Sequence, residues 1–389
     1  MQSARRRADT DSPNSDCRLS SAQINVAAGR RDRTLAFADF FRNFASVGLA
    51  ALLLASAPAD FVHAEDATPA KELFGAVTLP TRGKPTPYGF YAKGCQGGAV
   101  AIPTDGPTWQ AMRLSRNRRW GQPQLIALIE RLSRDAAKYD GWPGLLLGDI
   151  AQPRGGPMRT GHASHQIGLD ADIWLNPMPP RRLSSDEREN ISARSMLKPN
   201  AFLTVDPNIW TPAHARLIMR AASYPEVERI FVNPAIKKKL CDTWTGDRTA
   251  LGKVRPYYGH DYHFHIRMHC PAGATNCKAQ APVPAGDGCD KSLAWWFTKE
   301  PWAKPDKKPD TKPVKPRYTM LSDLPKACAL ILEAPSVPSA AAATMGKSVA
   351  PEPAASDVDS ASEPLPSDVE PAYGETGNVP IPLVKPVSR

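Results

Sequence analysis

The sequence lacks three features that would each point to a different class of protein: an apolar stretch of 18 or more residues, a C-x-x-C pair and an H-E-x-x-H motif. The first absence argues against a conventional membrane-spanning helix and stable membrane insertion. The second argues against a cysteine zinc cluster. The third excludes a thermolysin-like zinc site. The chain does have 40 prolines among its 389 residues, about twice the usual share of roughly 5%. Part of it is therefore expected to lie outside a globular domain.

The net charge of +10 is unevenly distributed. Residues 1–64 carry eight Arg and six Asp, and residues 331–389 carry eight acidic and three basic side chains. The stretch between them therefore carries a net charge of +13. A basic domain predicts an acidic partner, which could be an anionic polymer, an anionic lipid or nucleic acid. Nucleic acid is disfavoured, because the chain has an export signal and no recognised nucleic-acid motif.

Residues 1–64 are predicted to be a leader with a secretory signal peptide. The apolar run 47–57 is too short to span a bilayer, follows Arg33 and Arg42, and precedes Val62-His-Ala64. A basic region, an apolar region and small residues at the exit are typical of a secretory signal, here with cleavage after Ala64. The alternative is a buried helix of the mature protein.

The other end of the chain, 333–389, is rich in Ala, Pro, Ser and acidic residues. Such a segment cannot bury enough apolar surface to offset its chain entropy, so it is predicted to be a disordered acidic tail. Residues 304–316 form a Lys/Pro linker that should be extended and semi-rigid. The folded domain is therefore expected to span 65–332.

Cysteine is scarce but even in number outside the leader, which contains Cys17. An even count behind a signal peptide argues for disulfides in an oxidising compartment. Six cysteines allow fifteen connectivities, and spacing alone does not choose among them. Only Cys270 and Cys277 are close enough in sequence to suggest a small loop.

The hydrophobic pattern predicts an α+β fold. It places helices at 122–139 and 211–223 and strands at 145–147, 168–175, 229–233 and 261–269. Strands and helices alternate without a regular repeat, which favours a mostly antiparallel central sheet with flanking helices.

Six of the eight histidines fall into two short segments. His162 and His165 precede Asp170 and Asp172, and a second group contains His260, His263, His265 and His269. His263 and His265 are two residues apart, so a strand would place both imidazoles on one face.

This pattern predicts a catalytic zinc site on the sheet. Three protein ligands could come from His165, Asp172 and the histidines of the second group, and a fourth position would stay open for water. This is the arrangement of a catalytic zinc site, not of a structural one. Two histidines on one strand face, taken alone, are more often packed or surface side chains than metal ligands. Their occurrence together with the H-x₆-D pattern of His165 and Asp172 favours a metal site. We assign Asp172 to the metal and Asp170 to the orientation of a ligand, although both share a strand face and spacing does not force this choice.

Three long segments, 154–174, 229–237 and 260–271, resemble the penicillin-insensitive murein endopeptidases. These are zinc peptidases of the group that includes lysostaphin and D-Ala-D-Ala carboxypeptidases. The resemblance covers about 80–332, essentially the whole expected domain. It implies cleavage of D-alanyl–diaminopimelyl cross-links in peptidoglycan, in the periplasm, and peptidoglycan is an anionic polymer that suits the basic domain.

The resemblance also implies roles for individual residues. Zinc would be held by His165, Asp172 and His265, with His263 as the catalytic base or transition-state stabiliser. His162 would be a further ligand or a close neighbour of the metal. His260 would lie beside the reacting centre.

Further implications concern the rest of the domain. The family's disulfides correspond to Cys95–Cys328, Cys241–Cys289 and Cys270–Cys277. Ligands for a second, peripheral zinc around 201–204 are absent, so one Zn²⁺ per chain is expected.

Two further features suggest contacts with a substrate. Arg159 could pair with a substrate carboxylate or be a plain surface residue, and Gly155-Gly156 would let a peptide backbone approach closely.

The competing function is a non-catalytic zinc- or wall-binding module on the same scaffold, since a zinc site alone does not guarantee turnover.

Overall fold

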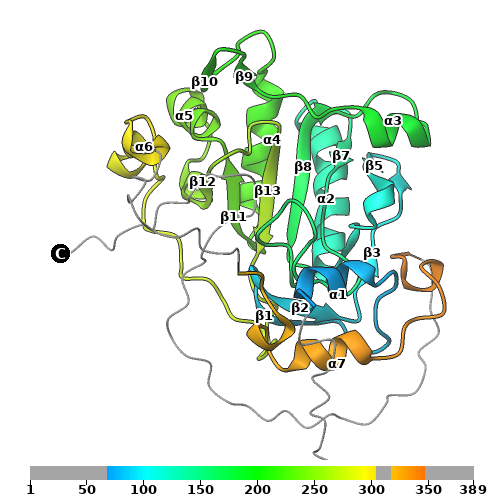
Figure 1. Ribbon diagram of the computed structural model, residues 1–389. Coiled ribbons are helices and arrows are strands. Elements are labelled where there is room, and N and C mark those ends of the chain that lie inside the picture. Colours follow the sequence, from blue (N-terminus) through cyan, green and yellow to red (C-terminus); the bar gives the residue numbers. More distant parts are fainter. Residues whose placement is uncertain (1–67, 304–316, 347–389) are drawn as a thin grey trace, which may run out of the picture. The chain divides into compact units, whose positions relative to one another are not determined.

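The computed structural model describes residues 68–303 and 317–346 (Figure 1), all within one compact unit, Phe61–Arg389. The expected leader, the Lys/Pro linker and the part of the expected tail from 347 onward lie outside the described residues. No helix within the described ranges has both the length and the apolar character needed to cross a bilayer.

The centre of the fold is a seven-stranded sheet with the order β12-β11-β13-β8-β7-β5-β4. Its strands are β4 (Asp105–Gly106), β5 (Trp109–Ala111), β7 (Leu145–Leu147), β8 (Asp170–Pro177), β11 (Val227–Val232), β12 (Val254–Pro256) and β13 (His263–Met268). The three longest are β8 with eight residues and β11 and β13 with six each, and β13 lies between the other two. The four strands expected from the sequence therefore form the middle of the sheet.

The sheet is mixed, which corrects the prediction of a mostly antiparallel one. The central pairs are antiparallel, but β5 pairs with β7 and β11 pairs with β12 in parallel. Each parallel pair is joined by a crossover helix, α2 (Pro123–Tyr139) or α5 (Pro234–Thr243), as parallel strands require. Because β5 and β12 have three residues each, they are too short to show an alternating pattern in the sequence.

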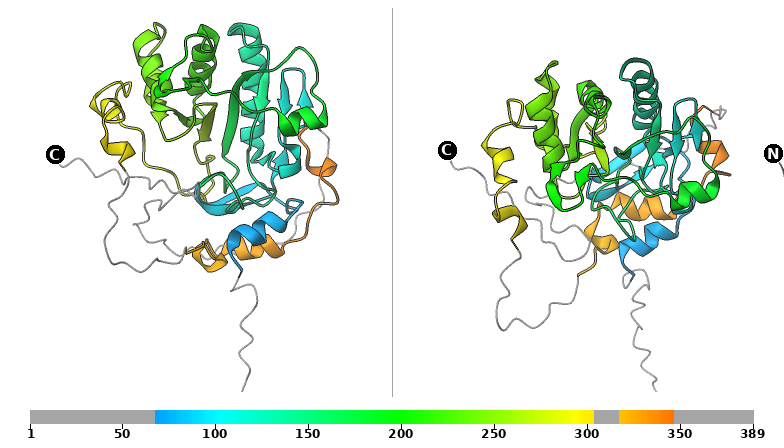
Figure 2. Two further views of the ribbon diagram at one scale, coloured as in Figure 1. Left: turned by 45° about the horizontal axis from the view of Figure 1, so that its top comes forward. Right: turned by 90° about the horizontal axis from the view of Figure 1, so that it is seen from above.

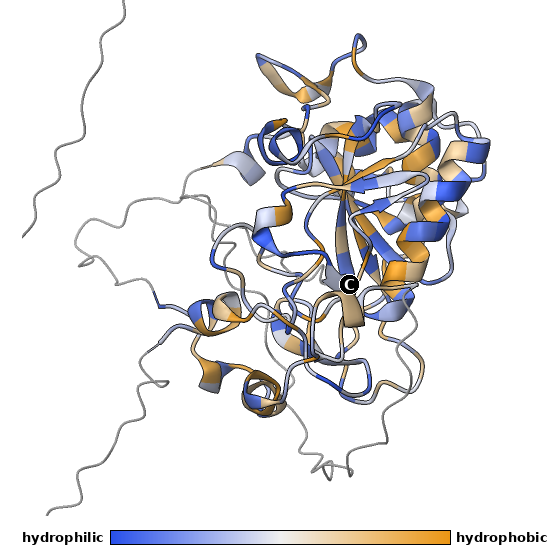
Figure 3. Ribbon diagram, turned by 90° about the vertical axis from the view of Figure 1, so that its right-hand side faces the viewer, coloured by the Kyte–Doolittle hydropathy of each residue, from blue (hydrophilic) through white to orange (hydrophobic). Residues whose placement is uncertain are grey.

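Helices α2 and α4 (Pro212–Ser223) lie side by side along the sheet (Figure 2). Both begin with proline at the first turn, and Thr211 and His214 form a reciprocal cap on α4. Their buried residues recur at helical spacing and join the strands in the main hydrophobic core, so the flanking helices are two-sided in hydropathy (Figure 3). The helices predicted at 122–139 and 211–223 are therefore confirmed.

The remaining elements are short and surround the central sheet. Three two-stranded sheets are formed by β1 (Thr86–Phe90) with β2 (Lys93–Gly97), β3 (Val100–Ala101) with β6 (Trp120–Gly121), and β9 (Leu197–Lys198) with β10 (Ala201–Val205). The other helices are α1 (Ala70–Ala76), α3 (Ser185–Asn190), α6 (Lys291–Trp295) and α7 (Ala327–Glu333). A 3₁₀ helix, η2 (Leu114–Arg116), follows β5.

Three disulfides join these parts, with the pairing that the resemblance implies. Cys95 on β2 bonds to Cys328 on α7, and both are fully buried in a second apolar cluster with Phe74 of α1. The other two bonds are Cys241–Cys289 and Cys270–Cys277. The first bond ties elements from the two ends of the described chain together.

Ordered structure continues beyond the expected domain boundary at 332. The amide of Val337 donates to the carbonyl of Pro80 (3.1 Å), and the amide of Met345 donates to that of Ala101 (2.9 Å). A 3₁₀ helix spans Ala341–Ala343. The described part of the expected disordered tail, 333–346, therefore forms hydrogen bonds with the domain, which composition alone does not reveal.

Candidate metal centre and substrate pocket

Strands β8 and β13 bring the two sequence motifs into direct register. His265 lies opposite Asp172, and Arg267 lies opposite Asp170. Since alternate residues of a strand share a face, both aspartates and both strand histidines are on the same side of the sheet. His162 and His165 approach that side from the loop that precedes β8.

Four imidazole nitrogens surround the carboxylate of Asp172. Its Oδ1 lies 3.4 Å from His165 Nε2, 3.5 Å from His263 Nε2 and 3.5 Å from His265 Nδ1. Its Oδ2 lies 3.4 Å from His162 Nδ1. Tetrahedral zinc, with ligand distances of about 2.0–2.2 Å, sets its ligand atoms roughly 3.3–3.6 Å apart. These separations therefore match the edges of a zinc coordination shell.

The protonation of two of these rings follows from their other hydrogen bonds. His165 Nδ1 donates to the carbonyl of Ile150, and His265 Nε2 donates to Asp170 Oδ1 at 2.8 Å. Each neutral ring therefore turns a lone pair toward Asp172, itself an acceptor. His165 Nε2 and Asp172 Oδ1 are buried and have no hydrogen-bond partner in the described chain. Buried acceptors that face one another are unfavourable unless a cation lies between them, so these residues fit a metal ion.

Three of these residues form a group compact enough to hold one metal ion. Ligand atoms of His162, His165 and Asp172 all lie within 4.8 Å of one another. Imidazole nitrogen with carboxylate oxygen is a donor set that zinc accepts readily.

Asp170 differs from Asp172 because both of its carboxylate oxygens accept hydrogen bonds. Its oxygens accept from His265 Nε2, from Arg267 Nε (2.8 Å) and from the amide of His165 (3.0 Å). A carboxylate behind a metal-binding histidine fixes the orientation of the ring and raises its basicity. Asp170 thus orients one histidine from each of the two sequence motifs.

Electrostatics hold three of these side chains in the protonation state that metal binding needs. Burial lowers the pKa of His263 to about 3 and that of His265 to about 4, so both rings are neutral at neutral pH. Burial raises the pKa of Asp172, but its histidine neighbours, His263 first, outweigh this and hold the pKa well below its usual range. His165 differs: burial lowers its pKa, yet the charge of Asp172 outweighs burial and the net shift is upward. A metal ion bound at His165 Nε2 would therefore compete with a proton, because only the neutral ring offers a lone pair.

Backbone strain is concentrated in the same place. His165 (φ 68°) and His260 (φ 53°) have left-handed backbones, which are uncommon for residues other than glycine. Such strain persists where the surrounding structure enforces it, and it gathers at functional sites. The ring centroid of His260 lies 4.9 Å from that of His263.

Residues 87–333 match the model of the penicillin-insensitive murein endopeptidase family. The chain belongs to this family. It is 47% identical over 255 residues to the penicillin-insensitive murein endopeptidase of Haemophilus influenzae, covering 65% of this chain and 85% of that protein. Proteins of the same name from Yersinia enterocolitica and Klebsiella pneumoniae are each 40% identical, over 66% of this chain and 89% of their own length.

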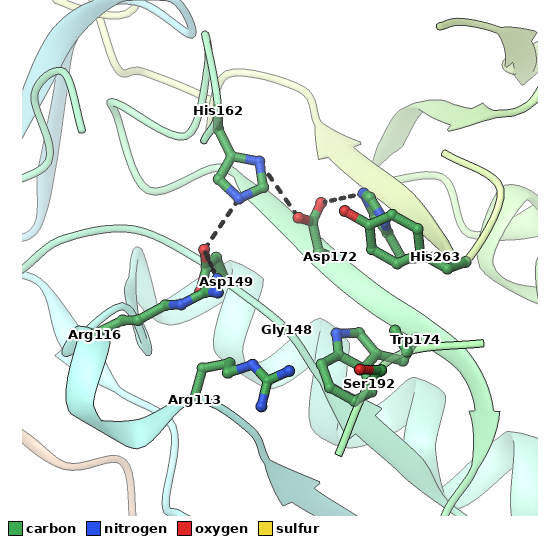
Figure 4. Close-up of a pocket in the computed structure, with 11 residues that line it drawn as sticks. Arg113, Arg116, Gly148, Asp149, His162, Asp172, Trp174, Ser192 and His263 are labelled. Carbon is green, nitrogen blue, oxygen red and sulfur yellow. Dashed lines mark hydrogen bonds and ion pairs between the residues drawn. The ribbon is translucent and has the colours of Figure 1, made fainter. Parts of the chain in front are cut away.

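The four histidines around Asp172, together with Asp172 itself, are called the candidate metal group, or metal group, from here on. In this family member the group opens into a pocket of about 230 Å³ (Figure 4). The pocket is lined by His162, Asp172 and His263 together with Asp149, Arg113 and Arg116. A peptide could therefore reach the metal group from this side.

Asp149 is a site residue that the sequence did not reveal. Its Oδ2 accepts from His162 Nε2 at 3.1 Å (Figure 4). The same oxygen accepts from Arg116 Nη1 (3.1 Å) and Arg118 Nη1 (2.9 Å). Asp149 follows strand β7, and its pattern there is that of an ordinary strand end. Only the fold brings it to His162.

Two features that suggested substrate contacts lie elsewhere. Arg159 pairs with Glu72 of α1 at 2.7 Å and is not among the residues that line the pocket. A Cβ on Gly155 would come within 1.9 Å of the carbonyl of Gln166, and one on Gly156 would meet the ring of Phe74. The two glycines therefore allow close packing within the chain itself, around the loop that carries His165.

Proposed function

We propose that this chain is a zinc-dependent murein endopeptidase that hydrolyses D-alanyl–diaminopimelyl cross-links of peptidoglycan. Membership of the family supports endopeptidase activity on murein. Zinc dependence rests on one observation above all: buried lone pairs of His165 and His265 converge on the unpaired Oδ1 of Asp172. The disulfides and the expected signal peptide support the periplasm as the site of action.

We assign the metal to His165 Nε2, Asp172 Oδ1 and His265 Nδ1, with Asp170 as the residue that orients His265. Zinc bound there would polarise the scissile carbonyl and lower the pKa of water from about 15.7 toward 7. His162, anchored by Asp149, presents Nδ1 to the same centre as a further ligand.

His263 is assigned as the general base. It lines the pocket, it is neutral at neutral pH because of burial, and its Nδ1 has no hydrogen-bond partner in the described chain. A neutral imidazole can take a proton from the attacking water and pass it to the leaving amine. An open pocket beside this base favours catalysis over a module that only binds the wall.

Digestion of purified cross-linked muropeptides tests the proposal. The protein should release uncross-linked products, a chelator should abolish release, and added zinc should restore it. Mass analysis of the products should place the cut between D-alanine and diaminopimelate. Binding to the muropeptides without cleavage, with zinc present, would instead support the non-catalytic module.

A further inference from the structure

Two arginines line one side of the pocket beside the metal group (Figure 4). Arg113 and Arg116 line it together with His162 and His263. Neither arginine belongs to the motifs that carry the metal ligands. Their position raises the question of which substrate group they face.

The two arginines are engaged to different extents. The guanidinium of Arg113 donates to backbone carbonyls of Arg188, Glu189 and Ile191, so it holds a loop. The side chain of Arg116 is 47% exposed, and its guanidinium forms one hydrogen bond within the described chain, from Nη1 to Asp149. A guanidinium has five N–H donors. Arg116 therefore has donors left for a ligand in the pocket.

Arg116 shares its carboxylate partner with a second arginine. Arg116 Nη1 and Arg118 Nη1 both donate to Oδ2 of Asp149, whereas the carboxylate of Glu189 accepts from Ser115. Two guanidinium groups therefore lie against one carboxylate at this edge of the pocket, and such a local arrangement favours an anionic ligand. A carboxylate is the anion that a guanidinium fork binds best by paired hydrogen bonds.

The segment that carries Arg116 is held in a strained conformation. The helix η2 is bracketed by Arg113 (φ 53°) and Asn117 (φ 52°), both left-handed. In the described ranges, the other non-glycine residues with positive φ are His165 and His260. Both the amide and the hydroxyl of Ser115 donate to Glu189 at 2.8 Å, which fixes the turn. Strain enforced in this way marks functional segments.

We propose that Arg116 binds the carboxylate on the carbon that bears the scissile nitrogen, and that it thereby determines specificity. Each amine of diaminopimelate is attached to a carbon that also carries a carboxylate. A cross-link made through one of these amines therefore has an anion directly beside the bond to be cut. Arg116 and His162 donate to the same oxygen of Asp149, which places the guanidinium at the edge of the metal group. This inference rests on the proposed function.

The test uses two cross-linked peptides that differ only at this carboxylate, one with the free acid and one with its primary amide. The wild-type protein should prefer the acid by about 10–100-fold in kcat/KM, the worth of a charge-assisted hydrogen-bond pair. Arg116→Ala should remove most of this preference, mainly through KM for the acid. Arg116→Lys should retain part of it, because an ammonium keeps the charge without the fork.

Arg317→Ala is the matched control, since Arg317 is exposed and pairs with one carboxylate, Asp323. It should leave the preference unchanged. Zinc content and Tm of each variant identify misfolding, in which case Arg116→Lys decides. An equal loss on both peptides would show that Arg116 acts only by holding Asp149, and the inference would be wrong. Equal cleavage of both by the wild type would also overturn it, whereas cleavage of neither would defeat the proposed function.

Discussion

At the scale of single residues, hydrogen-bond partners distinguish two aspartates that look equivalent in the sequence. Asp170 and Asp172 are two residues apart on β8 and face the same side. Asp170 is fully engaged by His265, His165 and Arg267, whereas Asp172 keeps a buried, unpaired oxygen. The difference favours Asp172 as the ligand and Asp170 as the residue that supports two ligands.

The roles of the two strand histidines should separate experimentally. His265→Ala removes a ligand, so zinc content and activity should fall together. His263→Ala should keep most of the zinc but reduce turnover by about 10²–10⁴-fold, the typical worth of general acid–base catalysis. Metal analysis and cross-link cleavage rates of both variants provide the measurement. Loss of zinc from the His263 variant alone would reverse the two assignments, and full activity in both would place the site elsewhere.

Asp170→Asn tests the support of the ligands. The amide keeps the shape of the side chain but removes the charge behind His265 and beside Arg267, so zinc affinity should fall by about 10–100-fold. Competition with a chromogenic chelator measures this affinity. Asp105→Asn, a change at a carboxylate that pairs with Arg188 and Arg182 away from the pocket, is the control. Unchanged affinity in the Asp170 variant would mean that it does not orient the ligands.

At the scale of elements, the register of β8 and β13 builds the strand half of the site, and a tight loop builds the other half. That loop passes from Gly155 to Gly168 and carries His162 and His165. Its path depends on a backbone approach at Gly155, where a Cβ would overlap the carbonyl of Gln166. Close packing at Gly155 against Gln166, the residue after His165, therefore helps to determine where His165 lies.

Gly155→Ala should disturb this loop. An alanine at φ +64° costs about 1–2 kcal/mol, and the overlap with Gln166 adds roughly 1–3 kcal/mol of overpacking. Gly273→Ala is the matched control, because Gly273 has φ +76° but no atom within 4 Å of its Cβ position. Urea denaturation should show the larger loss for Gly155, together with reduced zinc content. Equal losses would mean that only the backbone conformation matters.

At the scale of the whole molecule, the disulfides bridge very different lengths of chain. Cys95 and Cys328 are 233 residues apart, whereas Cys270 and Cys277 are 7 apart. In the chain-entropy model the longer loop restricts the unfolded chain more, by up to about 3 kcal/mol. The Cys95–Cys328 bond also joins β2 to α7 inside the second apolar cluster.

Replacing each pair by serine should reveal this difference. The Cys95→Ser/Cys328→Ser variant should lose more stability in urea than the Cys270→Ser/Cys277→Ser variant. Both should keep zinc if they fold, since neither pair contacts the metal group. A larger loss from the short loop would show that local strain outweighs chain entropy here.

Metal removal should affect activity far more than folding. The fold has a large hydrophobic core and three disulfides, which should hold it without zinc. Chelation should abolish cleavage and lower Tm by a few degrees, at roughly 2–4 °C per kcal/mol for a domain of this size. Calorimetry of the apo and zinc-loaded protein checks this. Unfolding on chelation would make zinc a structural ion.

The sequence by itself determined the features that depend on local pattern. Helical spacing and proline at the first turn located α2 and α4, and short apolar segments, one of them alternating, located the central strands. Two histidine motifs indicated the candidate metal group. Resemblance to the family supplied the disulfide pairing that the spacing of six cysteines left open.

Tertiary structure alone decided the features that depend on contacts between distant segments. The parallel strands β5 and β12 are too short for a pattern and exist because crossover helices return the chain to the sheet. Asp149 and Arg116 join the site only when the segments after β7 and β5 meet His162. The hydrogen bonds that distinguish Asp170 from Asp172 also depend on the fold, because two of the partners of Asp170, His265 and Arg267, lie far away in the chain.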